Sequence, residues 1–415
     1  MTKNSNGHIH DLQVFSRAAL EKRVDDHGFK NIARLELFLW DLELFLQIQA
    51  VFGDRIVLKG GAAVQFYLPI AAQRTSVDID MIFAGTKEEI EEALELITQN
   101  LKGNEIFFQF RPHIPQMPKT NLPLHTYYVN VPTVLNDNEL RSLRRKEEHE
   151  EAHQELKIEF IVNYADIDIS KVRGDQIFAV ASPFYYNILP INYLFADKLS
   201  TLGPSTIGIQ DNRLDEQVKQ FYDIWMLMKY NFSTINLETV REKYLNRARQ
   251  ECDSRNIEFD FNQINSDVMA QLKRYAEVDT GEDVELKQYI SNFKSLYLNA
   301  NVEFSGAAIA CAAEQLKLLF VEIVSGSCDM KIIEKSLKLQ NDISLKHLTG
   351  ISKGAKNNEL RNILIDSFGE YSSIPLKVLK GKNPVRIFWS VVNRENIDEI
   401  EKLVFDCLSN ELIGS

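Results

Sequence analysis

The sequence predicts an α+β protein in which a part containing strands precedes a helical C-terminal part. Two observations support this prediction. Segments with period-two alternation, such as Leu156–Val162, indicate strands in the first part. From Leu189 onward helical patterns follow one another, and no convincing strand pattern occurs after about residue 180. This segregation of strands and helices is typical of an α+β architecture.

The first expected elements are two helices, over residues 11–26 and 31–52, and the second has a broad apolar face. A strand, a glycine turn, a short helix and a second strand follow over residues 55–84. Thr86–Glu89 matches the capping box T-x-x-E, which predicts a helix that begins there and runs to about Leu101.

Three further strands are expected, over residues 105–111, 124–134 and 156–162. Further helices are expected at 190–202, 215–230, 237–252, 262–277, 283–299, 305–325, 329–340, 358–368 and 394–410. The change from strands to helices places a domain boundary between residues 230 and 260. We therefore assign a first domain to residues 1–240 and a helical, bundle-like domain to residues 241–415.

Composition limits the class of protein. A chain of 415 residues is long enough for two or three domains, and 45% hydrophobic residues supply a sizeable core. The formal net charge of −12 argues against a general nucleic-acid-coating protein, but it is compatible with a local basic groove. The four cysteines are far apart, no signal peptide is visible, and no run of about 18 apolar residues occurs. We expect a cytoplasmic protein without a membrane span.

The segment 56–83 is the most informative about function. Gly60 and Gly61 follow a strand, and residues without a Cβ let the backbone approach a phosphate closely. Asp78 and Asp80 alternate with apolar residues, so both carboxylates face the same side of a strand, about 6–7 Å apart. Two such carboxylates can hold a pair of magnesium ions about 4 Å apart.

Other residues complete a candidate site for metal-dependent nucleotidyl transfer, which needs carboxylates, a phosphate-binding turn and a cation. Glu159, on a later strand, is the candidate third carboxylate. Lys198 lies at the edge of the apolar stripe of its helix, where a lysine can reach a pocket. Arg74 and Ser76 precede the aspartates and are candidates for phosphate contact. Each feature alone also has a structural interpretation, such as a solvated strand face, an ordinary turn or a snorkelling lysine. Their combination in this order favours the functional one.

Two groups of motifs resemble those of one known family. The first is Leu58–Val64 with the pattern Arg74-x-Ser76-x-Asp78-x-Asp80. The second is Ala196–Leu202, which is similar to an A-x-K-L helix, followed by Arg213 and Lys219–Ile224, which are similar to an R…K-D-x-Y-D helix. In this order the groups resemble the AbiEii/AbiGii toxin family of nucleotidyltransferases. These are the toxin halves of type IV toxin–antitoxin, phage-abortive-infection systems. The resemblance covers roughly residues 30–230.

The resemblance implies the minimal nucleotidyltransferase fold, a mixed sheet flanked by helices. It implies that Gly60 and Gly61 hold the phosphates of the nucleotide and that Asp78 and Asp80 hold magnesium. It also implies that Lys198 contacts the triphosphate. Asp223 matches the last aspartate of the second signature.

The chain departs from the family pattern at three positions. Ala62 stands where the family usually has Ser or Thr, so a hydroxyl contact to phosphate is absent. Glu159 stands where Asp is common in the superfamily. Gln220 replaces the acid that usually follows Lys219.

We therefore predict a magnesium-dependent nucleotidyltransferase that moves a nucleoside monophosphate from an NTP to an acceptor and releases pyrophosphate. By the resemblance, the acceptor is an RNA, such as the tRNA 3′ end, or a protein, and a cognate antitoxin reverses the growth arrest. The alternative is a non-catalytic nucleotide-binding or interaction protein on the same fold. Ala62 and Gln220 favour this alternative, whereas Asp78, Asp80 and Lys198 count against it.

Two further patterns each have a functional and a structural interpretation. His149 and His153 match H-E-x-x-H, which holds zinc in peptidases. The charged flanks favour a solvated segment, and a zinc hydrolase is the less favoured alternative. Two basic clusters are candidates for contact with RNA phosphate or are solvated turns: Lys377, Lys380, Lys382 and Arg386, and Arg141, Arg144, Arg145 and Lys146.

Overall fold

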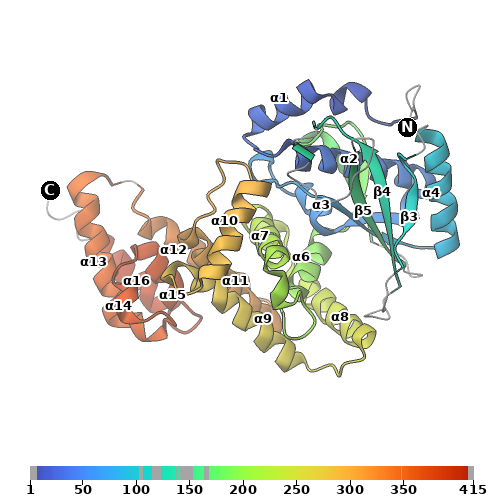
Figure 1. The fold of residues 1–415 in the computed structure, drawn as a ribbon. Coiled ribbons are helices and arrows are strands. Elements are labelled where there is room, and N and C mark those ends of the chain that lie inside the picture. Colours follow the sequence, from blue (N-terminus) through green and yellow to red (C-terminus); the bar gives the residue numbers. More distant parts are fainter. Residues whose placement is uncertain are drawn as a thin grey trace.

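The computed structural model describes residues 7–101, 106–114, 123–136, 139–140, 153–162, 168–346 and 348–409. These residues form a seven-stranded mixed sheet in the order β3-β4-β5-β2-β1-β7-β6. The strands are β1 (Ile56–Lys59), β2 (Asp78–Phe83), β3 (Phe110–Pro112), β4 (Leu124–Pro132), β5 (His153–Val162), β6 (Ser170–Arg173) and β7 (Tyr185–Ile188). Helices flank the sheet, and further helices make up the C-terminal part, so the predicted fold class is confirmed (Figure 1).

The central strands determine which way the two aspartates of β2 point. β2 pairs in parallel with β5 and antiparallel with β1, which is in turn parallel to β7. Along β2, Ile79, Met81 and Phe83 are fully buried, whereas Asp78 and Asp80 face the other side. Because the apolar face is buried in the core, both carboxylates are directed away from it.

The described residues of the N-terminal part include the helices α1 (Arg17–His27), α2 (Ile32–Phe52), α3 (Gly60–Gln65) and α4 (Lys87–Leu101). A 3-10 helix at Leu12–Phe15 precedes α1. The predicted capping box of α4 is present. The backbone N–H of Thr86 donates to Glu89 Oε2 at 2.9 Å, and the N–H of Glu89 donates to Thr86 Oγ1 at 3.3 Å.

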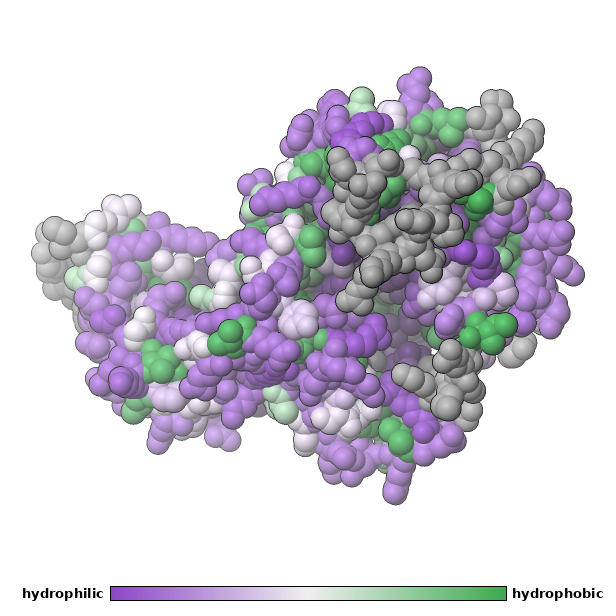
Figure 2. Space-filling view, in the orientation of Figure 1, coloured by the Kyte–Doolittle hydropathy of each residue, from purple (hydrophilic) through white to green (hydrophobic). Residues whose placement is uncertain are grey.

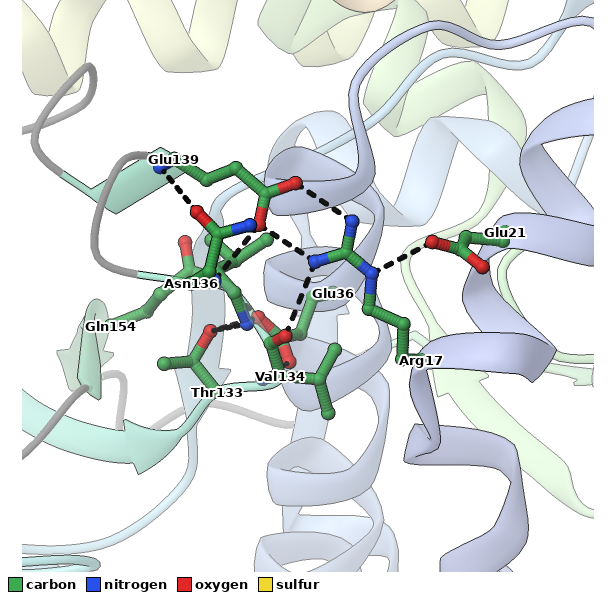
Figure 3. A network of polar contacts seen from close by, with 9 residues as sticks. Arg17, Glu21, Glu36, Thr133, Val134, Asn136, Glu139 and Gln154 are labelled. Atoms are coloured by element: carbon green, nitrogen blue, oxygen red, sulfur yellow. Dashed lines mark hydrogen bonds and ion pairs between the residues drawn. The ribbon is translucent and has the colours of Figure 1, made fainter.

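A polar network fastens α1 and α2 to the chain that follows β4 (Figure 3). The buried carboxylate of Glu36 on α2 accepts hydrogen bonds from Thr133 Oγ1 at 2.6 Å and from the backbone N–H of Val134 at 2.7 Å. Arg17 on α1 donates to Glu139 Oε2 at 2.7 Å. Burial raises the pKa of Glu36 in spite of these bonds. The network holds one end of the sheet against its covering helices.

The remaining helices follow in chain order: α6 (Ile191–Ser200), α7 (Leu214–Asn231), α8 (Leu237–Arg255), α9 (Phe261–Ala276), α10 (Val284–Tyr297), α11 (Gly306–Ser325), α12 (Lys331–Ile343), α13 (Gly350–Phe368), α14 (Leu376–Leu379), α15 (Pro384–Val391) and α16 (Ile397–Ser409). α6 packs against α7 and α8, and α11 packs against α9 and α15. In Figure 1, α6 and α7 lie beside the sheet and α13 to α16 lie farthest from it. The domain division at residue 240 stays a prediction.

Several short elements were missed or misplaced by the sequence prediction. The prediction of no strand after about residue 180 is wrong, because β7 spans Tyr185–Ile188. Its four residues are too few to show an alternation, and its buried Asn187 breaks the apolar pattern. The strand predicted at 105–111 is only Phe110–Pro112 among the described residues. α15 also went unpredicted, although Asn383 caps it and Pro384 begins it.

In the basic cluster around Gly381, Lys377 and Lys380 are exposed, whereas Lys382 and Arg386 are not free at the surface. Arg386 is fully buried, and its Nε lies 3.2 Å from Asp279 Oδ2. Lys382 Nζ lies 2.9 Å from the same oxygen. Two of the four cations therefore bind an acid of the helical part. The cluster Arg141, Arg144, Arg145 and Lys146 lies outside the described residues.

The face of the molecule shown in Figure 2 is mainly polar. On the face shown in Figure 2, hydrophobic residues form small, separate groups among hydrophilic ones. No helix in the described part of the chain has the length and apolar character needed to cross a membrane. Cys252, Cys311, Cys328 and Cys407 are free thiols.

Candidate active site

Adjacent strands bring the predicted carboxylates together on one face of the sheet. Asp80 on β2 lies in register with Glu159 on the parallel strand β5 and with Lys59 on the antiparallel strand β1. Asp78 lies two residues before Asp80 and therefore on the same face. A cavity of about 240 Å³ opens there, and its lining includes Gly60 of α3, Asp80, Glu159, Lys198 and Gln220.

Gly60 makes room for the Asp80 carboxylate. Its φ is +70°, in the region where only glycine is unstrained. A Cβ built on Gly60 lies 2.1 Å from Asp80 Oδ2, so a side chain there cannot coexist with the observed carboxylate. A Cβ on Gly61 lies 2.5 Å from Arg74 Nη2. In this structure the glycine pair admits Asp80 and Arg74, and its contact with phosphate stays a prediction.

We expect Gly60→Ala to displace Asp80 and to reduce nucleotide transfer by about 10²-fold or more, as loss of one precisely placed polar group does. Gly350→Ala is the matched control, because Gly350 also has a positive φ, +63°, but has no atom within 4 Å of the added Cβ. It separates backbone strain from the clash. Steady-state rates and urea unfolding of both variants provide the measurement. Equal losses of activity in the two variants would contradict the role of the Gly60 contact.

Burial makes ionisation of the two aspartates less favourable. Burial, together with the charges of Glu159 and Asp78, raises the pKa of Asp80 to about 7. Burial likewise raises the pKa of Asp78. Within the described residues, neither carboxylate has a hydrogen-bond or ion-pair partner. Paired carboxylates in this condition suit a hard divalent cation such as magnesium, so Asp78 and Asp80 fit the implied metal.

Glu159 is less clearly a metal ligand. Its Oε2 lies 2.8 Å from Lys157 Nζ, and its Oε1 accepts a hydrogen bond from Thr126 Oγ1 at 3.2 Å. Within the described ranges, no group of three or more His, Cys, Asp or Glu side chains is arranged to hold a metal ion. The structure thus places Glu159 next to Asp80 in the sheet, and its role as third metal ligand stays a prediction.

Lys198, Asp223 and Arg74 form a buried ion-pair cluster between α6, α7 and the chain before β2. Arg74 Nε and Nη2 donate to the two oxygens of Asp223, each at 2.7 Å. Lys198 Nζ lies 2.9 Å from Asp223 Oδ2 and also donates to Gln220 Oε1. Burial raises the pKa of Asp223, but Arg74 and Lys198 outweigh this effect and the pKa is lowered. Asp223 therefore stays ionised and holds both cations in place.

The predicted site residues in and near this cluster differ in their access to the cavity. Lys198 lines the cavity with Asp80, so it is placed to meet an anionic ligand. Asp223 is 0% exposed and acts through Lys198 and Arg74 rather than on a substrate. Arg74 is 4% exposed and its guanidinium is occupied by Asp223. Ser76 is buried as well. Phosphate contact by Arg74 and Ser76 stays a prediction.

Comparison with known proteins decides the family. A family model described as "Nucleotidyl transferase AbiEii toxin, Type IV TA system" matches residues 44–294, more than half of the chain. The chain belongs to this family. Among curated protein sequences none matches significantly.

Solved structures of low sequence identity are also similar to this member of the AbiEii family. JHP933 from Helicobacter pylori is 16% identical, with a TM-score of 0.40 over 73% of this chain and 98% of its own. The nucleotidyltransferase toxin MenT4 from Mycobacterium tuberculosis is 11% identical, with a TM-score of 0.38 over 75% of this chain and 98% of its own. Membership in the AbiEii family makes the protein a toxin nucleotidyltransferase and favours the enzyme over the non-catalytic alternative.

Sequence reasoning missed several charged residues of this AbiEii site. Lys59 Nζ lies 3.3 Å from Asp197 Oδ1, and Arg247 Nε lies 3.4 Å from the same oxygen. Lys59 and Asp197 directly precede Gly60 and Lys198, which was the available signal. Arg247 lies on α8 and has no such signal in the sequence.

A second missed residue is Asp41 on α2, which is 1% exposed. Its two carboxylate oxygens have no hydrogen-bond partner in the described part of the chain. Burial, with the charges of Asp78 and Asp80, raises its pKa well above the usual value. Asp41 therefore favours the neutral acid. In the sequence it is a single aspartate within an apolar helix.

The structure contradicts the zinc alternative at one of its two histidines. His149 lies outside the described residues. His153 is buried and is the first residue of β5, a strand. The H-E-x-x-H site needs both histidines on one helix, one turn apart, and His153 is not part of a helix.

Proposed function

We propose that this protein is a magnesium-dependent enzyme that transfers a nucleoside monophosphate from an NTP to an RNA acceptor, such as the tRNA 3′ end. The observation that carries the proposal is the pair of carboxylates Asp78 and Asp80 on one face of β2, with Asp80 and Lys198 lining the same cavity. Such a pair favours bound cations, and the lysine adds a positive charge for the phosphates of an NTP.

In the proposed reaction, a hydroxyl oxygen of the acceptor forms a bond to the α-phosphorus and its proton passes to water. The bond between the α-phosphorus and the bridging oxygen of the β-phosphate breaks, and pyrophosphate leaves. Asp78 and Asp80 would hold magnesium, which supplies charge stabilisation for the attacking and leaving oxygens. Lys198, oriented by Asp223, would contact the departing phosphates. Gly60 keeps the Asp80 carboxylate in position.

As a toxin of the type IV family, the protein is proposed to act with a cognate antitoxin that reverses growth arrest. The net charge of −12 makes general binding to RNA unfavourable, so acceptor recognition is proposed to depend on local contacts near the cavity.

Transfer of labelled nucleotide tests the proposal. The purified protein and the variant Asp80→Ala are incubated with each α-labelled NTP, magnesium and total cellular RNA, with and without EDTA. We expect RNA labelling by the wild type with magnesium, and none by the variant or with EDTA. Labelling of protein instead of RNA would show that the acceptor is a protein. Absence of both labelling and NTP binding would overturn the proposed function.

A further inference from the structure

A larger cavity of about 660 Å³ adjoins the candidate active site. It shares Lys59, Ile161, Asp197 and Arg247 with the smaller cavity that contains Asp80. Its volume is within the range typical of small-molecule sites. The two cavities are therefore neighbouring compartments along one face of the sheet, and the larger one has no role in the reaction described so far.

The floor of this larger cavity continues the sheet face that carries the aspartates. Ile82 lies two residues beyond Asp80 on β2, and Ile161 lies two residues beyond Glu159 on β5. Two residues of a strand span about 6–7 Å. The sheet face is thus polar around Asp80 and becomes apolar about the length of one nucleoside further along. Val162 and Leu189 complete this apolar floor.

The opposite wall comes from α8, where Lys243, Asn246, Arg247 and Gln250 all line the cavity. Their spacing of three and four residues places them on one stripe of the helix. The structure gives the side-chain amides of Asn246 and Gln250 no hydrogen bond within the described residues. Each amide offers both a donor and an acceptor, which is the pattern that recognises the edge of a nucleobase.

Each of the three cations that line the larger cavity, Lys59, Lys243 and Arg247, has an acidic partner. Lys59 and Arg247 both bind Asp197, at 3.3 and 3.4 Å. Lys243 Nζ lies 3.0 Å from Glu242 and 4.5 Å from the ring centroid of Tyr193. Three aspartates, Asp168, Asp197 and Asp253, line the cavity together with these cations, so the cavity is poorly suited to an extra phosphate. Its available chemistry is an apolar floor with amides above it.

We propose that the larger cavity binds a nucleobase, whose flat face lies on Ile82 and Ile161 and whose edge is read by Asn246 and Gln250. This inference rests on the proposed function, since it places the base beside the carboxylates that act on the phosphate. The base belongs either to the NTP or to the terminal nucleotide of the acceptor. In both cases the site determines which nucleotide the enzyme selects.

The test compares the wild type with the double variant Asn246→Ala/Gln250→Ala. The control is Gln288→Ala/Asn292→Ala, which removes an exposed amide pair at the same four-residue spacing on α10. Calorimetry with magnesium measures the affinities of ATP, CTP, GTP, UTP and inorganic tripolyphosphate. A second arm measures labelling of short oligoribonucleotides that end in A, C, G or U.

We expect the preference among bases, measured as a ratio of affinities, to be about tenfold smaller in the double variant than in the wild type. This is in keeping with the loss of a paired amide contact. Its affinity for tripolyphosphate should stay within about twofold of wild type, because Lys198, Asp78 and Asp80 are unchanged. A loss of preference among NTPs assigns the base to the NTP. A loss confined to the oligoribonucleotide arm assigns it to the acceptor.

Unchanged preferences in both arms would overturn the nucleobase site while leaving the proposed function intact. A wild-type protein that binds neither an NTP nor tripolyphosphate would instead refute the proposed function. An equal loss in the Gln288→Ala/Asn292→Ala control would also count against the nucleobase site, since that pair lies outside the cavity lining.

Discussion

Replacement of Asp80 by asparagine is expected to reduce nucleotide transfer by on the order of 10³-fold and, at the same time, to stabilise the metal-free protein. The loss of activity follows because one carboxylate of the proposed metal pair is removed, and such a cation contributes several kcal/mol to the reaction. The gain in stability follows because the Asp80 carboxylate is buried beside Asp78 and Glu159. Asparagine has nearly the same shape and carries no charge.

The stability gained through Asp80→Asn should increase as the pH rises. The folded protein raises the pKa of Asp80 from 3.8 to about 7, so the folded state binds a proton more tightly than the unfolded state. The stability of the wild type therefore falls as the pH rises from about 4 to about 7, and it changes no further from this cause above that. The variant should exceed the wild type by on the order of 2–4 kcal/mol at pH 8 and by little near pH 4.

Urea unfolding in EDTA at pH 4.5, 6 and 8 measures this difference. Asp366→Asn, which removes an exposed carboxylate on α13, is the control and should change stability by less than about 0.5 kcal/mol at each pH. If the variant Asp80→Asn is less stable than the wild type at pH 8, the Asp80 carboxylate does not destabilise the folded protein and the prediction is wrong.

The second large effect is expected at Asp223. Asp223→Asn removes the one anion between two buried cations, Arg74 and Lys198, which are 4% and 3% exposed. Breaking a buried ion pair in this way costs about 3–5 kcal/mol, because the remaining charges stay buried without compensation. We expect a loss of this size in the free energy of unfolding, together with a fall in transfer activity as Lys198 loses its anchor.

Asp398→Asn is the matched control, because Asp398 accepts from Lys335 at 2.6 Å but its side chain is 90% exposed. An exposed pair contributes about 0–1 kcal/mol, so this control should be nearly neutral. If Asp223→Asn does not fold, Arg74→Lys keeps the charge and loses only the two-pronged contact. That variant should lose less stability than Asp223→Asn. Similar small effects at Asp223 and Asp398 would contradict the importance of burial.

The parts of the site that the sequence predicted are those with local patterns. Asp78 and Asp80 lie two residues apart on a strand, so their common face follows from strand geometry alone. Gly60 and Lys198 belong to short motifs with a clear order in the chain. Long-range register then placed Glu159 opposite Asp80, which the sequence could not specify.

The missed features depend on contacts between residues distant in the chain. In the sequence, Arg386 is part of a basic turn that could be exposed. In the structure it pairs with Asp279, which lies on another element, and it is buried in the core. Arg247 belongs to a charged helical stretch, and only the packing of α8 on α6 brings it to Asp197. Arg74 was predicted to face phosphate because it precedes the aspartates. Its bond with Asp223 was not predicted, because Asp223 lies 149 residues later in the chain.

The Arg74–Asp223–Lys198 cluster also bears on the order in which the toxin matures during translation. The ribosome completes β2, with both aspartates, long before it reaches α6 and α7. The nascent chain then lacks Lys198, and even after α6 is made Lys198 lacks the anion that orients it. Because a buried cation without its counterion is unfavourable, the final geometry has to await the docking of α7. A chain that ends before Asp223 would therefore carry the carboxylate pair without the anion that orients Lys198.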